Sequence, residues 1–142
     1  MLSQGDKTGD PDILTLLKQD LKERFNKPGN VYLGLVHRLD RPVGGVMVFA
    51  KTSKAAARLA EQICGHRFEK TYIAIIHGVP EKKTGTLVHY LLKNRQTNMV
   101  VSVNKGTPGA KEAVLDYEVV GSSGDLCLVK IILGTGRSHQ IR

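Results

Sequence analysis

The chain has 142 residues and is 41% hydrophobic, a length and apolar content that suit one folded domain with a core and exclude a disordered tail. It carries 21 Lys and Arg against 13 Asp and Glu, a formal charge of +8 that favours a polyanionic partner. A basic protein with no nucleic-acid role is the alternative interpretation.

Several classes of protein are disfavoured by what the sequence lacks. No apolar stretch of signal-peptide length opens the chain, and nowhere do about 18 uncharged apolar residues run together, so we expect a cytoplasmic protein without a membrane partner. Cys64 and Cys127 form no CxxC pair and are expected as reduced core residues. The five histidines lack a metal-ligand spacing, so we expect no metal.

The first third of the chain predicts a helix, a strand and a turn. Asp10 is expected as the N-cap of a helix with Pro11 at its first position, since apolar residues recur every fourth position from Ile13 to Phe25. The Asn26–Gly29 stretch should end this helix. Strands are then expected over residues 31–39 and 46–50, on either side of a Pro-Val-Gly-Gly turn.

A second helix, capped by Thr52 or Ser53, contains alanines that suggest close packing on a sheet. Strands then dominate, separated by expected hairpin loops at 94–98 and 121–125. The expected strands cover residues 71–78, 86–92, 99–104, 112–120 and 126–133. The predicted fold class is α+β, a mixed, largely antiparallel sheet with flanking helices in a single domain over residues 1–142. Because the chain stops where a helix could begin, we expect a fragment.

The stretch "HRLDR" at 37–41 is the most unusual in the chain. If the backbone is extended, Arg38 and Asp40 project to one face; Arg41 adds a second guanidinium, and the cations favour an ionised carboxylate suited to a nucleophile or base. The structural alternative is that Asp40 caps a turn and pairs with an arginine. Glycosidase chemistry usually needs two carboxylates, so a lone aspartate requires a leaving group such as uracil, whose negative charge is delocalised.

Three segments, taken together, resemble the RluA-type RNA pseudouridine synthases. They are "HRLDR" at 37–41, "KTY" at 70–72 and "GRSHQIR" at 136–142, in the family's order, and the likeness extends over nearly the whole chain from about Leu14. The resemblance implies the pseudouridine synthase fold, incomplete at both ends. It also implies a uridine in ribosomal or transfer RNA as substrate and no cofactor.

The resemblance assigns roles to individual residues. Asp40 matches the catalytic aspartate, and attack on the sugar, addition to the ring and abstraction of a sugar proton all stay open for it. Tyr72 matches the tyrosine that lies against the uracil, and Arg142 the arginine that pairs with the aspartate. Arg38, Arg41 and Arg137 are candidates for RNA contacts. Without the other motifs, Tyr72 would be interpreted as a core residue.

The chain departs from the family pattern after Asp40, where it reads "RPVGG" instead of an acidic residue followed by Thr-Ser-Gly. Two hydroxyls that could hydrogen-bond the turn are therefore missing. The family's first strand and its final strands should lie beyond Met1 and Arg142, so we expect the fragment to bind RNA and turn over poorly. Two rival hypotheses are a non-catalytic RNA-binding module on the same scaffold and an enzyme that acts on a free nucleotide.

Overall fold

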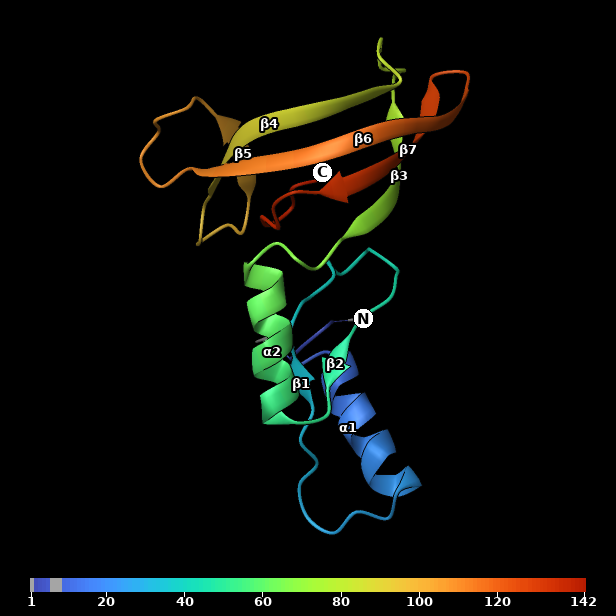
Figure 1. Ribbon diagram of the computed structural model, residues 1–142, viewed down its shortest axis with the longest axis vertical. Coiled ribbons are helices and arrows are strands. Elements are labelled where there is room, and N and C mark those ends of the chain that lie inside the picture. The colour runs from blue at the N-terminus through green and yellow to red at the C-terminus, as the bar shows by residue number, and fades with distance from the viewer. Residues whose placement is uncertain (1, 6–8) are drawn as a thin grey trace. The chain divides into compact units, whose positions relative to one another are not determined.

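The computed structural model describes residues 2–5 and 9–142, and the chain divides into two compact units, Met1–Arg67 and Phe68–Arg142 (Figure 1). The first unit holds helices α1 and α2 and a two-stranded sheet of β1 and β2. The second holds a five-stranded sheet of β3 to β7. The α+β class predicted from the sequence is confirmed.

Helix α1 spans Ile13–Arg24, and its N-cap is Asp12 rather than the predicted Asp10. The Asp12 carboxylate accepts hydrogen bonds from the Thr15 backbone N–H at 2.9 Å and from the Thr15 hydroxyl at 2.8 Å. Only a residue directly before the first turn can reach this N–H, and Asp10 instead pairs with Arg41. The bond from the Thr15 backbone is also the main cause that lowers the pKa of Asp12. The helix ends before Asn26, whose φ of 46° is left-handed, as the predicted stop at 26–29 requires.

Helix α2 spans Ser53–Cys64, with the Thr52 hydroxyl accepting a hydrogen bond from the Ala55 N–H at 3.1 Å. It packs on β1 (Gly34–Leu35) and β2 (Phe49–Ala50), which pair antiparallel. A Cβ on Gly34 would lie 3.1 Å from the Ala56 Cβ, so glycine and alanine together allow the close approach that the sequence predicted.

The two strands of the first unit are much shorter than the predicted 31–39 and 46–50. Only two residues of each strand pair through their backbones. Next to them, the Val48 N–H donates to the His37 Nε2 at 2.9 Å, so a side chain replaces the backbone carbonyl as its acceptor. Cys64 was also expected in the core and is exposed, since it is the last residue of α2.

In the second unit the five strands match the predicted ranges to within three residues at each end. Their order is β3-β7-β6-β4-β5, and every neighbouring pair is antiparallel. The bounds are β3 Thr71–His77, β4 Thr84–Lys93, β5 Val100–Val103, β6 Lys111–Ser123 and β7 Leu126–Leu133. A register shift between Val119 and Gly121 lets β6 continue, so the loop predicted at 121–125 shrinks to a turn at Gly124 and Asp125.

The sheet of the second unit has two distinct faces. Its core lies on the face that carries Tyr72, here called the Tyr72 face, where Cys127, Val129 and Ile131 of β7 are at most 4% exposed. The opposite face, here called the Ile73 face, leaves Ile73 and Ile75 more than half exposed. Ile141 packs against the same core, so the C-terminal segment covers part of the Tyr72 face.

Among the residues that the structure describes, no helix is both long and apolar enough to cross a bilayer.

Candidate functional site

Asp40 lies at the start of a tight turn in the first unit. The Asp40 carbonyl accepts the Val43 N–H at 2.9 Å, which closes the turn around Arg41 and Pro42. The residue is half-buried, whereas Arg38 and Arg41 on either side of it are exposed. The structure therefore places Asp40 and Arg41 in one turn, with Arg38 two residues before it, and Asp40 is the most enclosed of the three charged residues.

The segment that leads into the turn is held from two sides. The Ser3 hydroxyl donates to the Leu39 carbonyl at 3.1 Å and accepts the Leu39 N–H at 3.3 Å, so both polar groups of that peptide are satisfied. His37 is fixed by the hydrogen bond that its ring accepts from the Val48 N–H. These contacts fix the backbone on which Asp40 is displayed.

The two arginines of the motif differ in their contacts. Arg41 forms an ion pair with Asp10, and both side chains are about half exposed. Arg38 has no ion pair with any residue in the described part of the chain. Of the two, Arg38 is therefore the more available for an incoming phosphate.

In the second unit, Tyr72 lies on β3 opposite Ile131 of β7 and packs half-buried against the core. One side of the Tyr72 ring packs against apolar core residues, and this contact holds the ring rigid for stacking. Lys70, the first residue of the "KTY" motif, reaches the terminal segment. Its Nζ would lie 3.0 Å from a Cβ built on Gly136.

The terminal segment that carries Arg137 and Arg142 is tied to β6 by two polar side chains. The Thr135 hydroxyl accepts the Val114 N–H at 2.9 Å and contacts the Gln140 Oε1 at 2.9 Å, and Thr135 is 9% exposed. The Gln140 side chain also accepts the Arg137 N–H at 2.9 Å and donates to the Val114 carbonyl at 2.9 Å. Gln140 is thus the residue that folds the "GRSHQIR" motif onto the sheet.

The two arginines of this segment are both exposed. Arg137 donates through Nε to the Glu112 carbonyl at 2.8 Å, which places its guanidinium at the start of β6. The Arg142 N–H donates to the His139 carbonyl at 3.2 Å, within a turn in which His139 has a left-handed φ of 53°. Within the second unit, Tyr72 and the segment bearing Arg142 meet on the same core.

Sequence reasoning missed the residues that hold these motifs in place. Ser3 lies 36 positions from Leu39, and Gln140 lies 26 positions from Val114, so neither contact leaves a local pattern. The sequence singles out Gln140 only as part of the "GRSHQIR" motif. Among the described residues, no three His, Cys, Asp or Glu side chains are grouped so that they could hold a metal ion.

Comparison with known proteins defines the class to which this fold and these motifs belong. The family model described as RNA pseudouridylate synthase matches residues 1–142, so the chain belongs to the RNA pseudouridylate synthase family.

Two relatives illustrate the relationship. An uncharacterized RNA pseudouridine synthase of Chlorobaculum parvum is 40% identical over 111 residues, covering 77% of this chain and 34% of that protein. Ribosomal large subunit pseudouridine synthase C of Buchnera aphidicola subsp. Baizongia pistaciae is 35% identical over 121 residues, covering 84% of this chain and 38% of that protein. The chain spans somewhat more than a third of the length of these relatives.

Solved structures agree with the family assignment. Human RNA Pseudouridylate Synthase Domain Containing 4 superposes with a TM-score of 0.82 at 26% identity, over all of this chain and 55% of that one. Human RNA Pseudouridylate Synthase Domain Containing 1, at 24% identity and a TM-score of 0.69, supports the fold.

Proposed function

We propose that this protein is an RNA pseudouridine synthase that isomerises a uridine of ribosomal or transfer RNA, with Asp40 as the essential carboxylate. The observation that carries the proposal is that a chain belonging to this family displays Asp40 in a braced turn between two exposed arginines. The name of the Buchnera relative, a ribosomal large subunit pseudouridine synthase, favours ribosomal RNA. A cytoplasmic location follows from that choice of substrate, and residues 1–142 are proposed to act as one catalytic domain.

The reaction needs no external reagent. The bond from the sugar C1′ to N1 of uracil breaks, the base turns, and C1′ becomes bonded to C5; C5 loses its proton and N1 gains one. Because a departing uracil spreads its charge over two carbonyl groups, one carboxylate without a partner acid is enough. The proposal accordingly includes no cofactor and no metal.

The remaining roles follow from the chemistry of the side chains. A base can react only when it is flipped out of its stack, and the half-buried ring of Tyr72 offers an aromatic face for it. Arg142 is proposed as the third catalytic residue, because it matches the family arginine that pairs with the catalytic aspartate. Arg38, Arg41 and Arg137, all exposed, are proposed to contact the RNA backbone.

A tritium-release assay tests the proposal directly. RNA transcribed with uridine labelled at C5 loses tritium to water when pseudouridine forms. The unaltered chain should release tritium, and Asp40→Asn should release none while binding the same RNA with unchanged affinity. Asp125→Asn, at an exposed turn, is the matched control and should retain activity.

Two outcomes would contradict the proposal. Normal release by Asp40→Asn would remove the carboxylate from the mechanism. RNA binding by the unaltered chain without any release, on every uridine-containing RNA tested, would favour the non-catalytic binding module.

A further inference from the structure

The carboxylates of the five-stranded sheet all project from one face, together with Lys130 of β7 opposite Glu118, whereas two lysines project from the other face. Strand register places Lys111 opposite Leu91, and Lys93 lies two residues further along β4, so both lysines project from the Tyr72 face. The acidic residues of β6 are Glu112, Asp116 and Glu118, and they alternate with the core residues. They therefore project from the Ile73 face.

Among the residues that the structure describes, Lys93 and Lys111 have no acidic partner on their own face. They occupy a diagonal position on neighbouring strands, a separation of about 7–8 Å between backbones, and both are exposed. The nearest carboxylate in sequence, Glu112, accepts the Tyr90 hydroxyl at 3.0 Å on the other face of the sheet. Within the described part of the chain, neither lysine forms an ion pair. Two like charges this close favour an anion between them.

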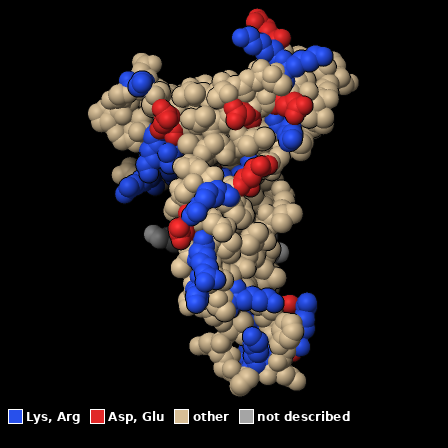
Figure 2. Space-filling view, viewed as in Figure 1, with Lys and Arg blue, Asp and Glu red and all other residues tan. Residues whose placement is uncertain are grey.

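The same face continues this line of positive charge toward the terminal segment. Arg137 donates to the carbonyl of Glu112, the residue directly after Lys111. Lys70 lies over Gly136, one residue before Arg137. Lys and Arg side chains also gather near the loop that joins β4 to β5 (Figure 2). Lys70, Arg137, Lys111 and Lys93 thus follow one another toward the end of β4, and among the described residues no acidic side chain of the five strands projects from this face.

We propose that Lys93 and Lys111 form a phosphate-binding track for the RNA strand that flanks the reacting uridine, continuing the contacts of Arg137. The inference rests on the proposed function, because it assigns the partner of the same site. Lysine ammonium groups are point charges that bind backbone phosphates without reading the base. The track therefore supplies affinity and position and leaves the choice of uridine to other contacts.

Removal of both charges should weaken binding in a salt-dependent way. For a fluorescently labelled single-stranded RNA that contains uridine, Lys93→Gln with Lys111→Gln should raise Kd roughly 10- to 30-fold at 0.1 M salt. The slope of log Kd against log salt should fall by about 1.4, or about 0.7 per lost phosphate contact. Lys93→Arg with Lys111→Arg should restore both values.

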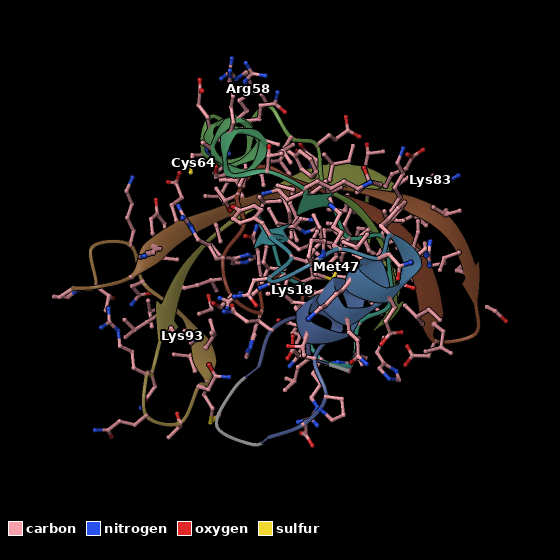
Figure 3. All side chains as sticks on the ribbon, turned by 90° about the horizontal axis from the view of Figure 1, so that it is seen from below. Lys18, Met47, Arg58, Cys64, Lys83 and Lys93 are labelled. Carbon is pink, nitrogen blue, oxygen red and sulfur yellow. The ribbon has the colours of Figure 1, made fainter. Side chains whose placement is uncertain are left out.

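A matched pair of lysines lies at the other end of the same strand. Lys82 and Lys83 directly precede β4, and Figure 3 shows Lys83 and Lys93 far apart. Lys82→Gln with Lys83→Gln removes the same charge and should change Kd less than about threefold. Circular dichroism and urea unfolding of each double variant check that the sheet is intact.

The outcomes separate this proposal from the proposed function. Equal weakening by the two double variants, or an unchanged salt slope in the first, would overturn the track even when tritium release is normal. Weakened binding with the smaller salt slope in the first variant alone, together with no tritium release by the unaltered chain, would support the track and overturn the catalytic proposal.

Discussion

Replacing Gln140 with alanine should loosen the terminal segment from the sheet. The Gln140 side chain takes part in three hydrogen bonds of 2.9 Å, with the Arg137 N–H, the Thr135 hydroxyl and the Val114 carbonyl. A hydrogen bond contributes about 1 kcal/mol net, so the free energy of unfolding of the second unit should fall by about 2–3 kcal/mol. With a urea m-value of about 1–3 kcal/mol/M, the unfolding midpoint should fall by on the order of 1 M.

Urea unfolding followed by circular dichroism measures this change, and tritium release should fall with it because Arg142 follows the loosened turn. Gln140→Glu keeps both acceptor functions, loses the donor to Val114 and places a charged oxygen against that carbonyl. It should therefore be no more stable than Gln140→Ala. Gln96→Ala, in the exposed β4–β5 loop, is the control and should leave the midpoint unchanged. Equal midpoints for Gln140→Ala and Gln96→Ala would refute the anchoring role.

Three further predictions concern helix ends and glycines. Thr52→Ala removes the acceptor at the start of α2 and should lower the free energy of unfolding by about 1 kcal/mol in urea, whereas Thr52→Ser should not. The folded-state pKa of Asp12 lies below its ordinary 3.8, so the Asp12 carboxylate stabilises α1 above that pH and loses this effect as the pH falls through the lowered pKa. Asp12→Asn should therefore flatten this part of an acid titration followed by circular dichroism at 222 nm. A Cβ at Gly85 would sit 2.9 Å from the Tyr117 ring, so Gly85→Ala should lose about 1–3 kcal/mol, whereas Gly121→Ala, with no atom within 4 Å, should lose no stability.

The sequence predicted the strands of the second unit better than those of the first, because different kinds of contact hold the strands of the two units. Strands β3 to β7 are runs of four to thirteen residues rich in Val, Ile, Leu and Tyr, and such runs between turn-forming residues are visible without knowledge of any partner strand. Strands β1 and β2 keep only two residues each, and the histidine ring that replaces their ladder leaves no periodic trace. The choice between Asp10 and Asp12 as N-cap likewise depended on which carboxylate reaches Thr15.

The candidate site was likewise predictable from the sequence only in part. Asp40, Tyr72 and Arg142 could be singled out because their short motifs occur together in one order. The contacts that brace them, from Ser3 to Leu39 and from Gln140 to Val114, join residues far apart in the chain and became visible only once the chain was folded. The proximity of Lys93 and Lys111 became visible only from the strand register, because the sequence does not show which residues of neighbouring strands lie side by side.

The separation of charge across the five-stranded sheet has a kinetic consequence. The Tyr72 face carries the ammonium groups of Lys93 and Lys111, whereas the Ile73 face carries three carboxylates of β6 against the single ammonium group of Lys130. The sheet therefore has an electric dipole perpendicular to its plane. A polyanion that diffuses toward such a layer is turned and guided to the positive side before any contact forms, at a rate that declines steeply with ionic strength. Stopped-flow association at low and high salt would reveal this guidance as a difference in on-rate, separate from any difference in dissociation.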